Sequence, residues 1–251
     1  MKNNPVFKKI IQILWPLLIW ELAALIMGER VLFAGPVDVI RCFPGLLREG
    51  GFYSSVWFSF KRIAGGFFAG SFTAIILAVI SGRYPHIETL VSPFLTVVKA
   101  VPVASFIIIA LIWISSRGLS MFISFLMVLP VVYTACLSGI KSTDPGMLDM
   151  AKLYRLTFMK KLRYIWLPSM RVSVLASCKT ALGLSFKAGI AAEVIGMPEG
   201  SIGERLYDAK VYLDTPALFA WTVVIVALSV IFEKAVVYLI KLFYRRLFKA
   251  V

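Results

Sequence analysis

The sequence is poor in the side chains on which most enzyme sites depend. Its 251 residues include one histidine, His86, and three cysteines, Cys42, Cys136 and Cys178. The cysteines are widely spaced, form no CxxC pair and lie far from the histidine, which argues against disulfide frameworks and metal sites. Acid–base or metal catalysis needs clustered histidine or acidic side chains, and the sequence contains few such clusters. An intramembrane enzyme is therefore a weak hypothesis.

Charge is also scarce, whereas apolar residues are abundant. Only 16% of the residues are charged and 60% are hydrophobic, against about 25% charged residues in a typical soluble domain. About 20 apolar residues in a helix cross a hydrocarbon core of ~30 Å, and a lipid-exposed backbone must satisfy its own hydrogen bonds. We predict an all-α integral membrane protein with six spans, at roughly 10–28, 60–82, 88–114, 119–140, 168–195 and 216–243.

The basic residues predict how these spans are oriented. The formal net charge is +14, and the lysines and arginines gather at the ends of apolar runs, which indicates anionic lipid nearby rather than a nucleic acid. Six spans place both termini, the 83–87 turn and the 141–163 loop on one side. That side holds fourteen lysines and arginines and the other side holds six. We therefore expect both termini to be cytoplasmic.

We treat the chain, residues 1–251, as a single transmembrane domain with a core at 55–245. The first helix, 10–28, should stay uncleaved, because its apolar run continues without a small-x-small cleavage site. Two outer loops, 29–55 and 196–215, are polar or rich in proline and glycine, and each is expected to hold a short helix. A cytoplasmic loop spans 141–167.

Residues 149–168, "DMAKLYRLTFMKKLRYIWLP", form the most distinctive part of that loop. The preceding Asp144-Pro145 predicts the start of a helix, and Pro168 predicts a turn into the next span. Apolar side chains recur every four residues and predict one continuous stripe along that helix: Met150, Tyr154, Phe158, Leu162 and Trp166. A basic amphipathic helix lying on anionic lipid would explain the same pattern.

The segment also resembles the cytoplasmic "EAA" loop of permease subunits of ABC importers. That loop reads Glu-Ala-Ala, then a glycine after three intervening residues, then an ending of the form hydrophobic-x-Leu-Pro. Asp149 falls on the glutamate, and Arg155 falls on the glycine that marks a turn between two short helices in the family. The remaining matches are Met150, Ala151, Ile165, Leu167 and Pro168.

Other stretches resemble the same family in the same order. They are "SFKRIAGGFFAG" (59–70), "VKAVPVASFIIIALIW" (98–113), and "GLSFKAGIAAEVIG" with the following "GSIGERLYDAKVYLDTPALFAW". The last two are similar to the nitrate/sulfonate/taurine branch. The resemblance implies the type I ABC importer permease fold, a homodimer and an extracytoplasmic substrate-binding protein that touches 29–55 and 196–215. It also implies a multi-pass protein of the bacterial cytoplasmic membrane.

The chain lacks a phosphate-binding loop of the form GxxxxGK[ST], since "GIKST" at 139–143 has the wrong glycine spacing. We therefore expect no enzymatic activity and no cofactor bound by this chain, with ATP and Mg on a separate ABC ATPase subunit. By resemblance, 145–163 would be the coupling helix seated on that ATPase. The residues assigned to this coupling are Asp149, Ala151, Tyr154, Arg155, Phe158, Leu162 and Pro168.

Lys187 is the leading candidate for a residue that lines a substrate pathway. It lies near the middle of span 168–195, where a charge costs ~2.5–3.5 kcal/mol on insertion scales and usually faces a cavity or a partner. A cation there suits a small anion such as a sulfonate, taurine or nitrate. A salt bridge to Glu193 or Glu21 is the alternative. The other pathway candidates are Ser185, Glu193, Pro102 and Trp113, although membrane helices commonly contain proline kinks and interfacial tryptophans.

Small residues recur every four positions in two spans, from Gly66 to Gly82 and from Ser173 to Gly189. Such stripes let helices approach closely, within one chain or between subunits. An autonomous secondary transporter or channel is the alternative function. It would be typified by inverted repeats and broken helices at the midplane, and no repeat relates 10–114 to 119–243.

Overall fold

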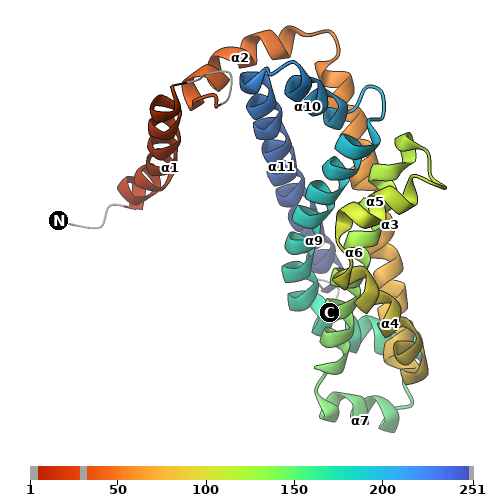
Figure 1. The fold of residues 1–251 in the computed structure, drawn as a ribbon. Helices are drawn as coiled ribbons and strands as arrows, with labels where there is room; N and C mark the ends of the chain where they lie inside the picture. The colour runs from red at the N-terminus through yellow and green to blue at the C-terminus, as the bar shows by residue number, and fades with distance from the viewer. Residues whose placement is uncertain (1–4, 29–32, 249–251) are drawn as a thin grey trace.

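The computed structural model describes residues 5–28 and 33–248, and every regular element within them is a helix (Figure 1). The predicted all-α membrane fold class is confirmed. The elements are α1 Pro5–Met27, α2 Pro36–Arg48, α3 Phe52–Arg83, α4 Pro85–Ala100, α5 Val103–Ala110, α6 Ser116–Lys141, α7 Pro145–Leu153, α8 Phe158–Lys161, the π-helical turn η1 Leu162–Trp166, α9 Leu167–Gly196, α10 Ile202–Val211 and α11 Thr215–Phe248.

Four helical stretches in the described part of the chain are long and apolar enough to cross a membrane: Phe52–Arg83, Ser116–Lys141, Phe158–Gly196 and Thr215–Arg246. A fifth span results if the bent pair α4 and α5 is counted as one. Within α1, the apolar stretch Leu14–Met27 is shorter than a full span. The six expected spans are thus matched by four clear ones, one broken one and one shorter helix.

The expected continuous span at 88–114 is wrong. Helices α4 and α5 meet at a bend of 102°, and Val101 between them has an extended backbone with ψ 134°. Pro102 explains the break, because proline lacks a backbone N–H and disfavours helical geometry in the residue before it.

Helix α6 lies in the middle of the bundle, packed between α3 and α9. The small-residue stripes make this packing possible. A side chain on Gly66 of α3 would collide with the Met121 carbonyl of α6, and a Cβ on Gly139 of α6 would lie 2.8 Å from the Met170 Cα of α9. These glycines therefore serve packing within the chain.

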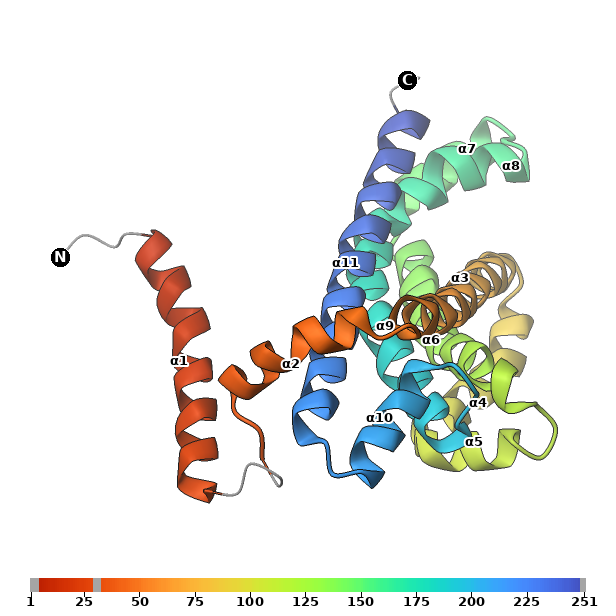
Figure 2. The same cartoon turned by 90° about the horizontal axis from the view of Figure 1, so that it is seen from above.

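The short helices α2 and α10, from the two segments expected to be outer loops, lie at one end of the molecule, whereas α7 lies at the opposite end (Figure 1). Helix α1 stands apart from the bundle in the view from above (Figure 2). Its Trp20 side chain donates a hydrogen bond to the Ala34 carbonyl at 3.0 Å and packs against Phe219 of α11. Most other described side chains of α1 are exposed.

Candidate coupling segment and translocation surface

The loop between α6 and α9 begins as the sequence predicts. The Asp144 carboxylate accepts a hydrogen bond from the Gly146 N–H at 3.1 Å and caps α7, with Pro145 in the first turn. Such a cap satisfies one of the backbone donors that are free at a helix start. The start of the segment is therefore set by local sequence.

The expected single helix over 145–163 is wrong, because α7 ends at Leu153 and the chain turns there. Arg155 has φ +48°, in the left-handed region. The Arg155 N–H bonds to the Lys152 carbonyl at 3.0 Å, and the Leu156 N–H bonds to the Ala151 carbonyl at 2.9 Å. This pair of bonds is a Schellman motif, which usually takes glycine at the left-handed position. Arg155, which the resemblance to the EAA pattern places on a glycine, thus takes the left-handed position of a turn.

The turn divides the expected apolar stripe into an outward and an inward part. Met150 and Tyr154 are exposed, and Tyr154 is 70% accessible. Phe158 instead packs edge-on against the buried Trp166, with ring centroids 5.9 Å apart, and Leu162 lies against the core. Phe158 and Leu162 are therefore partly buried and hold the segment to the bundle, unlike the exposed Met150 and Tyr154.

The turn expected at Pro168 is also wrong. The helical run continues from Phe158 to Gly196, with the π-helical turn η1 just before the proline. Within η1 the Leu167 N–H bonds to the Leu162 carbonyl. A π-turn is one way in which a helix accommodates a local disruption of its hydrogen bonds. Pro168 thus lies in the first turn of α9 without ending the run.

The exposed apolar surface of this segment contains more side chains than Met150 and Tyr154, the exposed part of the predicted stripe. We call it the α7 patch: Met147, Met150, Leu153, Tyr154 and Leu156, all exposed. Ala151 and Ile165 form the base of a shallow apolar pocket of about 260 Å³ in it. The predicted four-residue repeat does not contain Met147, Leu153 or Leu156. Met147, Met150 and Leu153 follow one another at three-residue spacing within α7, and only Leu156 lies beyond the left-handed turn at Arg155. Asp149 lies beside the patch in an exposed ion pair with Lys152 at 3.0 Å.

Lys187 lies on an open face of α9 together with Lys179 and Leu184, all exposed. The ion pairs among the described residues involve neither lysine. The salt bridge from Lys187 to Glu193 or Glu21 considered above is therefore not formed in this structure. Gly183 lies on the same face, and nothing is within 4 Å of a Cβ placed on it.

Ser185 and Glu193 face the interior of the chain, unlike Lys187. The Ser185 hydroxyl donates to the Leu182 carbonyl at 2.8 Å. Glu193 is fully buried and accepts a 2.5 Å hydrogen bond from the Ser59 hydroxyl of α3. The Gly203 N–H of α10 donates to the same carboxylate oxygen at 3.4 Å. In this structure, Glu193 therefore joins α3, α9 and α10 and does not line an open path.

Pro102 and Trp113 are both exposed, near the two ends of α5. Trp113 is 77% accessible. The outward face of α5 adds exposed Ile108 and Ile109, and Ile112 in the turn that follows α5 is also exposed. Helix α5 also contacts α9. The exposed faces of these two helices are therefore on neighbouring elements of the bundle.

The comparison with known sequences decides the family. Residues 66–249 match the family described as "Binding-protein-dependent transport system inner membrane component". The chain belongs to this family. The match includes α6, the turn at Arg155, and all of α9 and α10, so it covers both the coupling segment and the open face of α9.

Similar proteins include several named as ABC transporter permeases, among them sulfonate and taurine permeases. A protein of Brucella melitensis named as an ABC transporter permease is 24% identical over 205 residues, covering 81% of this chain and 83% of its own length. SsuC of Bacillus subtilis, named for aliphatic sulfonates transport, is 22% identical and covers 82% of this chain and 75% of itself. The taurine transport system permease protein TauC of Escherichia coli is 22% identical, with coverages of 85% and 80%.

Proposed function

We propose that this chain is the permease subunit of an ATP-driven importer, and that the α7 patch seats it on a separate ATPase. One observation carries the proposal: α7, which lies at one end of the molecule (Figure 1), presents an exposed apolar surface with adjoining cations. Exposed apolar groups of this kind mark partner surfaces. Because the similar proteins are ABC transporter permeases, we infer that the partner at this surface is an ATPase subunit.

The patch has the composition of an interface core. Tyr154 and the two methionines supply large side chains of the type that dominates binding energy. Lys152 and Arg155 lie among them and would provide charge complementarity, which governs orientation and association rate. ATP and Mg would bind to the ATPase, and its closure would move α7 and, through the continuous run from Phe158, the spanning helix α9.

We further propose that the open faces of α5 and α9 border the substrate path, and that the substrate is a small anion. Exposed Lys187 and Lys179 lie on the α9 face without an ion pair. A cation inside a span is costly unless it faces water, a cavity or a partner. The names of SsuC and TauC, which concern sulfonates and taurine, support an anionic substrate.

The same faces would close against a second copy of the chain to form a homodimer in the bacterial cytoplasmic membrane, with both termini in the cytoplasm. The fourteen-to-six distribution of basic residues supports this orientation. An extracytoplasmic binding protein would then deliver substrate at the end formed by α2 and α10. Within this proposal the chain carries out transport and binds no cofactor of its own.

Co-purification with the neighbouring ATPase tests the coupling proposal. The double variant Met150→Asp, Tyr154→Asp should lose the ATPase while remaining inserted and monodisperse, because two charges would enter a desolvated interface. The matched control is Val211→Asp, Tyr212→Asp, which places the same charges on exposed positions at the other end of the molecule. Equal recovery of the ATPase with both variants would contradict the coupling role. It would favour a helix that lies on the lipid surface and an autonomous transporter.

Uptake by cells expressing the complete importer tests the anion proposal, with sulfonates, taurine and nitrate as labelled substrates. Lys187→Gln should lower uptake of the transported anion and leave ATPase capture unchanged. Lys234→Gln, which removes an exposed lysine from α11, is the control and should transport normally. Unchanged uptake in the Lys187→Gln variant would remove this lysine from the path.

A further inference from the structure

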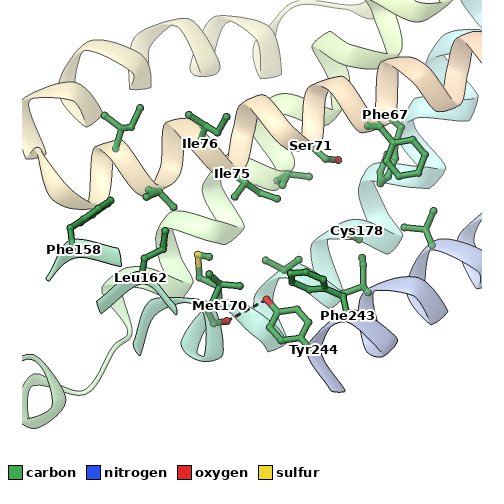
Figure 3. Close-up of a pocket in the computed structure, with 18 residues that line it drawn as sticks. Phe67, Ser71, Ile75, Ile76, Phe158, Leu162, Met170, Cys178, Phe243 and Tyr244 are labelled. Carbon is green, nitrogen blue, oxygen red and sulfur yellow. Dashed lines mark hydrogen bonds between the residues drawn. The ribbon is translucent and has the colours of Figure 1, made fainter. Parts of the chain in front are cut away.

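A deep apolar groove lies between α3, α9 and α11 and is closed at one end by α8 and η1 (Figure 3). Its volume is about 500 Å³. We call it the α3–α11 groove and define it by Phe67 and Ile75 of α3, Phe158 of α8, Met170 of α9, and Val236 and Tyr244 of α11. A cavity of this size is typical of sites for small organic ligands.

The walls of the groove offer almost no hydrogen bonding. The Tyr244 hydroxyl donates to the Leu167 carbonyl at 3.3 Å (Figure 3), so this donor is already used. Ser71 contributes one hydroxyl, and the other lining side chains are apolar except for the Cys178 thiol. An occupant must therefore be largely hydrocarbon.

The groove opens sideways onto an exposed apolar surface of the spanning helices α3 and α11, of the kind that lipid covers. Phe68, Ile76 and Phe243 line it and are at the same time exposed. The adjoining surface of α3 and α11 is also apolar, with exposed Phe72 and Leu239. A hydrocarbon chain can thus enter from the bilayer without crossing a polar barrier.

Cations lie beside the end of the groove that α8 and η1 close. The Arg83 guanidinium lies over the ring of Phe158 at 4.6 Å, and that of Arg171 lies over the ring of Tyr244 at 5.9 Å. Both rings line the groove. The ion pairs among the described residues include neither arginine, so their charge is available to an anion.

We propose that an anionic phospholipid occupies the α3–α11 groove, with an acyl chain along its apolar walls and its phosphate beside Arg83 and Arg171. The proposal rests on the proposed function in one respect, since that function places this end at the cytoplasmic face, where anionic lipids attract basic residues. Phe158 and Leu162 line the groove, so the bound chain would also steady the segment that connects the α7 patch to α9.

An apolar helix is the competing occupant, and the dimensions favour the lipid. A helix with its side chains is about 10–12 Å wide and would rest on the rim of a cavity of about 500 Å³ without filling it. An acyl chain is narrow enough to enter. The lipid headgroup also brings an anion to the two arginines. The apolar stretch of α1 from Leu14 to Met27 has one acidic side chain, Glu21.

Native mass spectrometry of the full chain tests the proposal, with phosphatidylglycerol and phosphatidylcholine of identical acyl chains as probes. The wild type should retain phosphatidylglycerol preferentially. Arg83→Gln, Arg171→Gln should reduce that retention roughly tenfold, to the level of phosphatidylcholine. The control Lys179→Gln, Lys187→Gln removes two exposed cations from another face of the bundle and should retain the lipid.

A second pair of variants tests the groove itself. Val236→Trp fills the cavity and should lower retention of both lipids, whereas Phe72→Trp adds the same ring on the outer surface of α3 and should not. The exposed arginine variants keep the test valid if Val236→Trp fails to fold. Equal lipid retention in wild type and the Arg83→Gln, Arg171→Gln variant would overturn the proposal.

A disulfide between Leu18→Cys and Ile76→Cys, in a chain whose native cysteines are replaced, would also overturn it, because α1 of this or a second copy would then cover the groove. ATPase capture is the independent readout in all these variants. If the arginine variant loses its preference for phosphatidylglycerol but still captures the ATPase, the lipid site is supported. If it binds both lipids as the wild type does and still captures the ATPase, the lipid site is refuted and the proposed function stands.

Discussion

At the scale of single residues, Arg155 shows what sequence reasoning could and could not provide. Alignment with the EAA pattern placed it on a glycine, which left open whether the turn survives. The structure keeps the turn, with φ +48° at Arg155, because two backbone hydrogen bonds close it whatever the side chain. A left-handed conformation of a residue other than glycine costs roughly 1–2 kcal/mol, so this position is strained.

Arg155→Gly should therefore stabilise the protein modestly. The relief of left-handed strain exceeds the extra unfolded-state entropy of glycine, which leaves about 0.5–1 kcal/mol. Arg155→Val should do the reverse, because a β-branched side chain tolerates positive φ poorly. Thermal unfolding of the detergent-purified chain measures both. A glycine variant less stable than the wild type would mean that Arg155 contributes contacts that outweigh its backbone strain.

Glu193 is the second residue whose role came from the structure. Its place near the outer end of a span suggested a path or a salt bridge, whereas its partners are Ser59 and Gly203, which are distant from it in sequence or on the following helix. Such a long-range arrangement leaves no local signal in the sequence.

Glu193→Ala should lower stability by about 1–3 kcal/mol, because it leaves buried donors of α3 and α10 without their acceptor. Glu193→Gln keeps an acceptor and should recover part of the loss. Glu199→Ala is the control, since Glu199 forms only an exposed ion pair with Arg117 at 3.5 Å, a type worth ~0–1 kcal/mol. Thermal unfolding midpoints compare the three, and equal losses for Glu193→Ala and Glu199→Ala would contradict the buried role.

At the scale of elements, long apolar runs predicted most spans well, and breaks were predicted poorly. Pro102 is compatible with a kinked continuous helix or with two separate helices, and the choice depends on packing outside the local sequence. The π-turn before Pro168 is similar, because the proline does not specify how its missing N–H is accommodated. The small-residue stripes predicted close approach but not the partner, which proved to be α6 for Gly66 and Gly70 of α3.

Gly66→Ala and Gly65→Ala make a matched pair for this packing. The methyl group of the first would collide with the α6 backbone at Met121, whereas that of the second meets only the flexible end of the Met121 side chain at 3.5 Å. We expect Gly66→Ala to cost roughly 1–3 kcal/mol, as overpacking does, and Gly65→Ala to be neutral or slightly stabilising. Thermal unfolding again decides, and equal stability of the two variants would contradict the close α3–α6 contact.

At the scale of the whole molecule, composition was enough to predict an all-α membrane protein, and the ordered resemblances were enough to predict its family. The sequence did not reveal which parts of the loop at 141–167 face outward, because the left-handed turn redirects the chain after Tyr154. The groove between α3 and α11 was also hidden, since its walls come from α3, from Val132 of α6, from the run that starts at Phe158, and from α11. Both features depend on the packing of elements distant in sequence.

The central claim is that the α7 patch seats this permease on its ATPase, and site-directed cross-linking in native membranes tests it most directly. Tyr154→Cys, in a chain without its other cysteines, should form a cross-link to the co-expressed ATPase through a short bifunctional reagent. Trp113→Cys, at a similarly exposed position just beyond the end of α5, should not. A cross-link from position 113 with none from position 154, or from neither position while the two proteins co-purify, would contradict the account.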